Sequence, residues 1–95
     1  MPEVYFTVLW PDGAQERCYS PSTVIKNHIA EGASYSLDEF VGKARTGLGE
    51  ASDRVAARYG FACSSAMAEL ARIEARANAL AGTEPANVRC IKIEG

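Results

Sequence analysis

The sequence predicts one α+β domain over residues 1–95, and three observations lead to this prediction. Segments rich in β-branched and aromatic residues stand at both ends of the chain, and two long alanine-rich patterns of helical period lie between them. Hydrophobic residues make up 47% of the chain, which at 95 residues is enough for a core without a disulfide or metal. We expect an N-terminal β-hairpin and a C-terminal strand to form a three-stranded sheet, covered on one face by two or three helices.

The first element is a β-hairpin. Residues 4–10 favour a strand, and residues 14–19 return after Pro11-Asp12-Gly13. Asp-Gly between extended segments predicts a tight turn, because glycine tolerates the positive φ that such turns require. Both faces of the first strand are partly apolar, which is typical of a central strand or one whose second face is partly covered. For the last strand, residues 88–93, we prefer a place beside the first strand.

A short helix is expected after the hairpin. The segment Ser20-Pro21-Ser22 is typical of a helix start, since serine caps well and proline fits the first helical position. The helix would cover about residues 21–30 and end at Gly32. The β-branched run of residues 23–25 also favours a strand, so an extended conformation stays open.

The first long helix begins at a capping box, Ser36-Leu37-Asp38-Glu39, and ends at Gly60. Gly42, Gly47 and Gly49 each cost about 1 kcal/mol of helix propensity relative to alanine. They therefore weaken the helix or permit close contact with another backbone. The apolar face of this helix consists of Leu37, Phe40, Val41, Ala44, Leu48, Ala51, Val55 and Tyr59.

A second helix is expected from Cys63 or Ser64 to Gly82. Its apolar stripe consists of Ala66, Met67, Leu70, Ile73, Ala77 and Leu80. Its solvent side consists of Glu69, Arg72, Glu74 and Arg76.

Composition excludes several classes of protein. The net charge of −2 and the pI of about 5.3 argue against a nucleic-acid binder, which usually carries a basic stripe. No apolar run reaches the roughly 18 residues of a membrane span, and no signal peptide is recognised. Three widely spaced cysteines favour reduced thiols in the cytoplasm over a disulfide framework.

The junction between the two long helices contains the strongest candidate for chemistry. Cys63 is expected at a helix N-terminus, where the helix dipole lowers the pKa of a thiol, and Ser64 adds a donor. Cys63 is thus the candidate nucleophile, although a small thiol packed in a tight corner is the simpler interpretation. Cys18 and His28 are close enough in sequence for a thiol–imidazole pair, or His28 lies on a helix surface. The cysteine and histidine spacings match no zinc motif, and we expect no metal or cofactor.

Other residues are candidates for binding a partner or ligand. Trp10 is either an exposed contact or a cap on the core, and Asp12 is most simply a turn residue. Tyr19, Tyr59 and Phe61 could line a pocket, although aromatic residues at a corner are usually buried. Arg58 could pair with a carboxylate or lie in solvent. The candidate binding set is Trp10, Asp12, Cys18, Tyr19, Arg58, Tyr59, Phe61, Cys63 and Ser64.

Three motifs together resemble a small bacterial family of nitrogen-starvation response proteins: Trp10-Pro11-Asp12-Gly13, Cys18-Tyr19-Ser20-Pro21-Ser22 and Arg58-Tyr59-Gly60-Phe61-Ala62-Cys63-Ser64. The resemblance covers nearly the whole chain. It implies nitrogen scavenging, of nitriles or cyanide, in the cytoplasm. It also implies a gene cluster that encodes a nitrilase, a radical SAM protein, an acetyltransferase-like protein, a flavoprotein and a protein similar to aminoimidazole ribonucleotide synthase.

Two functions follow as expectations. The first is a non-catalytic accessory or binding protein for one of the clustered enzymes, with no nucleic-acid or membrane partner. The alternative is a small enzyme or carrier that uses Cys63, with Arg58 and Tyr59 positioning a nitrile-derived or anionic small molecule. Pairing of free sheet edges would also allow a homodimer.

Overall fold

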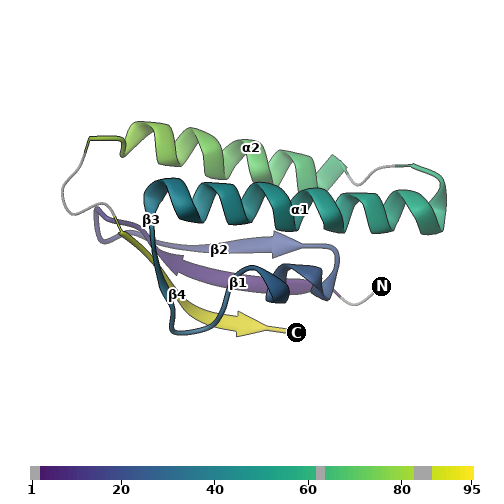
Figure 1. Cartoon of the computed structure of the whole chain (residues 1–95), viewed down its shortest axis with the longest axis horizontal. Coiled ribbons are helices and arrows are strands. Elements are labelled where there is room, and N and C mark those ends of the chain that lie inside the picture. Colours follow the sequence, from purple (N-terminus) through teal and green to yellow (C-terminus); the bar gives the residue numbers. More distant parts are fainter. Residues whose placement is uncertain (1–2, 62–63, 83–86) are drawn as a thin grey trace.

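The computed structural model describes residues 3–61, 64–82 and 87–95 and confirms the α+β class. Figure 1 shows two long antiparallel helices packed on one side of a sheet. The elements in chain order are β1 (Val4–Leu9), β2 (Gln15–Ser20), the 3-10 helix η1 (Thr23–Asn27), β3 (Ser34–Ser36), α1 (Leu37–Tyr59), α2 (Ser64–Ala79) and β4 (Asn87–Glu94).

The sheet is antiparallel throughout, with the strand order β2-β1-β4-β3. Its hairpin turn forms at the predicted Asp-Gly, where Gly13 has φ 90° and donates its N–H to the Trp10 carbonyl at 2.9 Å. β4 pairs with β1, as the apolar character of the first strand predicted. A β-bulge interrupts this pairing between Thr7 and Val8.

The prediction of three strands was wrong by one, because β3 also joins the sheet beside β4. β3 is a Ser-Tyr-Ser segment that lacks the apolar alternation of a half-buried strand. It is extended because its backbone pairs with β4, with Tyr35 opposite Val88. This pairing joins residues more than fifty positions apart, so no local pattern could indicate it.

The short helix is also smaller than predicted. It is a 3-10 helix over Thr23–Asn27 rather than a helix over residues 21–30, and Ser22 caps it by accepting the Val24 N–H at 3.3 Å. Gly32 does not end this helix but lies in the turn before β3, with φ 84°, and donates to the Cys90 carbonyl. Val24 and Ile25, the apolar residues that also favour a strand, are buried in this short helix.

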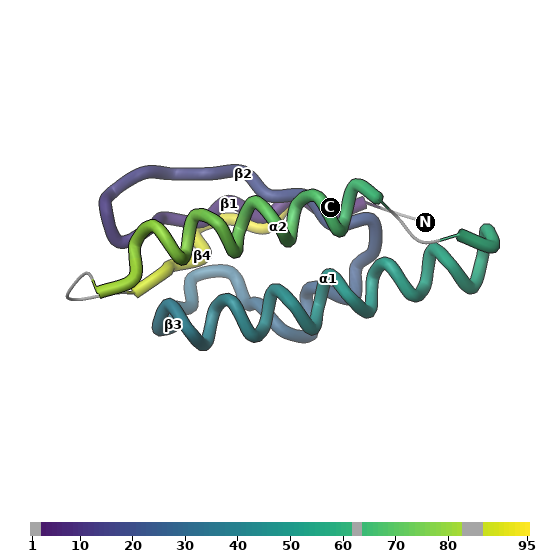
Figure 2. The backbone as a smooth tube through the Cα atoms, turned by 90° about the horizontal axis from the view of Figure 1, so that it is seen from above, coloured from purple at the N-terminus to yellow at the C-terminus, as the bar shows by residue number. Residues whose placement is uncertain are grey.

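The core lies between the sheet and the two helices. Seen from above, α2 lies in front of β1 and β4 (Figure 2). Val4, Phe6 and Val8 of β1 are fully buried and face the helices. The predicted capping box is present at the start of α1, with Ser36 accepting the Glu39 N–H and Glu39 accepting the Ser36 N–H. The apolar face of α1 is buried from Leu37 to Ala51 only.

The last two turns of α1 extend past the sheet (Figure 1), which is why the predicted apolar face does not stay buried there. Val55 is half-buried and Tyr59 is 52% exposed. The helical period continues to Tyr59, but the sheet beneath it has ended. This overhang places the predicted junction motif at the free end of the helical hairpin.

Candidate functional site

The junction between the helices presents its aromatic side chains to solvent. α1 ends at Gly60, whose φ of 86° closes the helix with its N–H on the Ala56 carbonyl at 2.8 Å. Tyr59 is 52% exposed and Phe61 is 69% exposed. Together with Met67 on α2, at 40%, they are the large hydrophobic side chains that the structure shows exposed among its described residues. We call these three residues the hairpin tip.

Two charged or polar candidates flank the hairpin tip. The Arg58 guanidinium carbon lies 5.7 Å from the Tyr59 ring centre, within the range of a cation–π contact. Ser64 is exposed and is the first residue of α2. Cys63, the candidate nucleophile, lies outside the described residues. The nucleophilic role therefore stays a prediction.

Trp10 lies at the other end of the molecule and belongs to the core. Its side chain is 1% exposed, and its ring packs edge-on against Phe40 with centroids 5.5 Å apart. The indole Nε1–H donates to Glu16 Oε1 at 2.8 Å, which satisfies its one polar atom. Of the two interpretations of Trp10, the cap on the core agrees with this placement.

Asp12 is a turn residue whose side chain also forms an ion pair with α2. Its Oδ1 accepts the Ala14 N–H at 3.0 Å, and its Oδ2 lies 2.7 Å from the Arg76 guanidinium on α2. The backbone hydrogen bond from Ala14, followed by Arg76, holds the pKa of the Asp12 carboxyl below its ordinary value. The first contact lies within the turn, and the second ties the hairpin turn to the end of α2.

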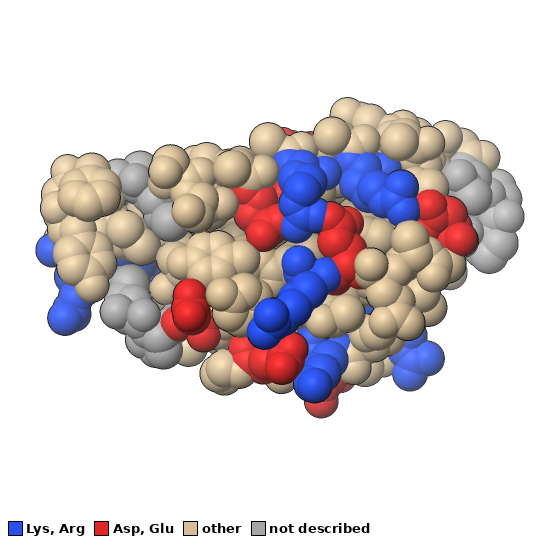
Figure 3. All heavy atoms as spheres, turned by 180° about the vertical axis from the view of Figure 1, so that it is seen from behind, with Lys and Arg blue, Asp and Glu red and all other residues tan. Residues whose placement is uncertain are grey.

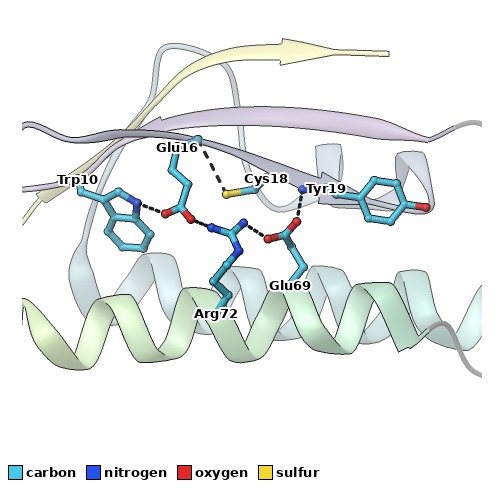
Figure 4. Close-up of polar contacts among 6 residues, drawn as sticks. All are labelled: Trp10, Glu16, Cys18, Tyr19, Glu69 and Arg72. Carbon is cyan, nitrogen blue, oxygen red and sulfur yellow. Dashed lines mark hydrogen bonds and ion pairs between the residues drawn. The ribbon is translucent and has the colours of Figure 1, made fainter.

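A polar network joins β2 to α2 (Figure 4). Arg72 of α2 forms ion pairs with both Glu16 and Glu69. Glu69 Oε2 accepts the Tyr19 backbone N–H at 3.0 Å, while Glu16 accepts the indole N–H of Trp10. Burial lowers the pKa of Arg72 from its ordinary value. The side of α2 that was predicted to face solvent is only partly exposed. Arg72 is exposed but pairs with Glu16 of β2, and Glu69 is largely buried against that strand.

Cys18 and His28 each have their own partners. Cys18 is fully buried, and its Sγ lies 4.0 Å from the Glu16 carbonyl. His28 Nε2 lies 2.8 Å from Glu50 Oε1 on α1. Burial, and to a lesser extent Cys90, raises the pKa of the Cys18 thiol to about 12. Burial likewise raises the pKa of Cys90, so both thiols are held in the unreactive protonated form.

We expect Cys18 and Cys90 to resist a thiol probe in the folded protein through pH 9, where an ordinary thiol is half ionised. Because the pKa of Cys18 is higher in the folded state, its contribution to stability falls as pH rises from about 9 toward about 12. Brief labelling with a thiol probe, followed by peptide mapping, measures the resistance of the two thiols, with fully unfolded protein as the reference. Equal labelling of Cys18 in both states would contradict the burial. The same digest tests the prediction that Cys63 reacts faster than Cys90 at pH 7.

Two shallow clefts lie beside the helices. One, of about 550 Å³, lies between the start of α1 and the end of α2, and the Arg45–Glu74 ion pair forms part of its wall. The other, of about 450 Å³, lies between the β2 edge and α2 and is lined by Tyr5, Tyr19, Ser65, Ala68, Glu69 and Arg72. Tyr19 is the predicted site residue that borders a cleft. Within the described residues, no group of histidine, cysteine or carboxylate side chains could hold a metal ion.

The predicted site residues do not form one site. Trp10 and Asp12 lie at the hairpin-turn end of the sheet, whereas Arg58, Tyr59, Phe61 and Ser64 lie at the opposite end (Figure 1). Sequence reasoning missed Met67 as an exposed residue because it fits the apolar stripe of α2. It also missed the contacts that Glu69 and Arg72 make with β2, because these join residues fifty or more positions apart.

These features define a small α+β domain with helices on one face of its sheet and an apolar tip on its helical hairpin. No helix among the described residues is long and apolar enough to cross a membrane. The chain belongs to the family of the nitrogen starvation-induced protein NitG, whose family model matches residues 5–93. The resemblance identified from the three motifs is thereby confirmed. No curated protein and no solved structure matches the chain.

Proposed function

We propose that this chain is an accessory protein that binds an enzyme of a nitrogen-starvation pathway through the hairpin tip. The observation that carries the proposal is the exposure of Tyr59 and Phe61 beyond the edge of the sheet. Aromatic residues are enriched at the energetic centres of protein interfaces, and Arg58 beside them is the other residue type favoured there. The family description supports the nitrogen-starvation context.

The partner we favour is a clustered enzyme, namely the nitrilase, the radical SAM protein or the flavoprotein, in the cytoplasm. The proposed role is to bind and not to turn over substrate. Cys18 and Cys90 lie in the core, and the raised pKa of each thiol disfavours a nucleophilic role. The competing role as an enzyme or carrier of a nitrile-derived or anionic molecule depends on Cys63, with Arg58 and Tyr59.

Replacing both Arg58 and Phe61 with alanine should abolish co-purification with the clustered enzyme from nitrogen-starved cells. Interface anchors of these types contribute about 2 kcal/mol or more each, so the loss of both should cost about 4 kcal/mol and lower the affinity about 700-fold. Growth on a nitrile as the sole nitrogen source should fail in the same strain. Arg54→Ala is the matched control, because Arg54 is exposed one turn earlier on α1.

Cys63→Ser separates the two functions. The accessory role requires that the folded variant support growth as well as the wild type does. An enzyme or carrier that uses the thiol requires growth to stop while the protein stays folded and abundant. Loss of growth with Cys63→Ser, together with full growth of the Arg58→Ala/Phe61→Ala variant, would refute the proposed role.

A further inference from the structure

The helices leave one face of the sheet uncovered. Side chains alternate along β1, so the neighbours of the buried residues Phe6 and Val8 point to the other side. Tyr5, Thr7 and Leu9 point that way and are only half-buried, although they lie on an interior strand of the sheet. Tyr5 also borders the cleft between the β2 edge and α2. Figures 1 and 2 show both helices on the opposite side of β1.

The neighbouring strands add mainly basic side chains to this face. Cross-strand pairing places Arg89 opposite Leu9, Lys92 and Arg17 opposite Thr7, and Glu94 opposite Tyr5. Three cations and one carboxylate give the strands a net charge of +2 here, whereas the whole chain has −2. We call Tyr5, Leu9, Arg17, Arg89, Lys92 and Glu94 the open sheet face. Glu3 precedes β1 and lies outside the strands.

Glu94 lies between two of these cations, at a position where the carboxylate of a partner would bind. Its Oε1 lies 3.4 Å from Arg17 Nε, and its Oε2 lies 3.7 Å from Lys92 Nζ. The Arg17 guanidinium carbon also lies 3.9 Å from the centre of the Tyr5 ring, a cation–π contact. Arg89 is exposed and has no ion pair within the described residues.

A second copy of this chain does not suit the open sheet face. Packing two such faces together would bring two surfaces of net charge +2 against each other. Pairing along the sheet edges is opposed as well, because the outward N–H groups of Tyr19 and Ile93 already donate to Glu69 and Glu31 at 3.0 and 2.7 Å. The face therefore favours a different molecule.

The mixture of charge and apolar surface distinguishes between two classes of partner. Nucleic-acid binders carry a continuous basic stripe, whereas Glu94 lies between Arg17 and Lys92 on the open sheet face. Acidic and basic side chains are also interleaved on the adjoining side of the molecule that Figure 3 shows. A phosphate backbone would also meet Glu94, which pairs with Arg17 and Lys92 at the Tyr5 end of the face. A peptide that carries both carboxylates and apolar side chains suits this face better. Its carboxylates would pair with Arg17, Lys92 and Arg89, and its apolar side chains would contact Leu9 and Tyr5.

We propose that the open sheet face binds an acidic amphipathic helix of a partner protein. The carboxylates of that helix replace Glu94 as partners of Arg17 and Lys92 and engage Arg89. Its apolar side chains cover Leu9 and the Tyr5 ring. This surface is separate from the hairpin tip and does not depend on the proposed role of Tyr59 and Phe61.

The test is nuclear magnetic resonance of the isotope-labelled full chain, titrated with a designed helical peptide of leucine and glutamate. We expect shifts of the Tyr5, Thr7, Leu9 and Lys92 amides, and binding that weakens as salt is added. Arg17→Glu and Arg89→Glu should each reduce the affinity about tenfold, because each places a like charge against the peptide. Glu94→Gln should raise it about threefold by freeing two cations.

Arg54→Glu makes the same charge change on the exposed side of α1 and should leave the affinity within about twofold. A peptide of leucine and lysine should not bind. Polyuridylate tests binding of a nucleic acid. If it bound more tightly than the acidic peptide and shifted the same amides, the face would be a nucleic-acid surface and the proposal would be wrong. Absence of shifts with the acidic peptide, shifts confined to the helices, or equal affinity of the Arg17→Glu and Arg54→Glu variants would overturn it. Circular dichroism confirms that each variant is folded.

Discussion

Trp10→Ala should lower the free energy of unfolding by about 3–5 kcal/mol, the range for removing a large aromatic side chain from a packed core. The indole is 1% exposed, packs against Phe40 and donates to Glu16, so its loss leaves a cavity and an unused acceptor. A small domain has roughly 5–15 kcal/mol in total, so this change removes much of its stability. Urea denaturation followed by circular dichroism measures it, because the variant lacks tryptophan fluorescence.

Trp10→Phe is the matched control for this prediction. It keeps an aromatic ring against Phe40 and loses the indole N–H that Glu16 accepts. Its cost should fall well below that of the alanine variant, because most of the buried apolar area is retained. A cost below about 1 kcal/mol for Trp10→Ala would mean that the side chain is not part of the core. The exposed-contact interpretation of Trp10 would then be restored.

Gly47→Ala and Gly49→Ala should change stability in opposite directions, although both glycines lie within α1. A β-carbon at Gly47 would overlap the Ile25 side chain and lie 3.3 Å from His28 Cδ2 and 3.6 Å from Ile25 Cα. Ile25 is 1% exposed and has little room to move, so we expect a loss of about 1–3 kcal/mol. A β-carbon at Gly49 meets nothing within 4 Å, so alanine there should gain about 0.5–1 kcal/mol.

Gly42→Ala serves as a second control, since its β-carbon also has open space around it. Thermal and urea unfolding of the three single variants under one set of conditions measure the differences. Equal stabilisation by all three substitutions would show that η1 does not pack closely on α1. The result would also decide between the two roles that the sequence allowed for these glycines, which were a weakened helix and a close approach.

The candidate site could be anticipated only in part. The junction of residues 58–64 stood out because glycine and two aromatic residues interrupt two helical patterns, and the structure places those aromatics in solvent. Trp10 stood out for its residue type, but its burial depends on Phe40 and Glu16. Of the open sheet face, the sequence indicated only the partly apolar second side of the first strand. The cations of this face come from β2 and β4, which are about seventy residues apart and meet only on either side of β1.

By itself, the sequence determined the α+β class, the Asp-Gly hairpin turn, the capping box at Ser36 and the end of α1 at Gly60. These features depend on hydrogen bonds and backbone angles within about four residues, so local residue types specify them. Tertiary structure alone decided that Ser34–Ser36 becomes a strand and that Thr23–Asn27 is a single short 3-10 helix. It also decided that the exposed Arg72 pairs with Glu16. Each of these outcomes depends on a partner far along the chain, whose position is set only when the helices pack on the sheet.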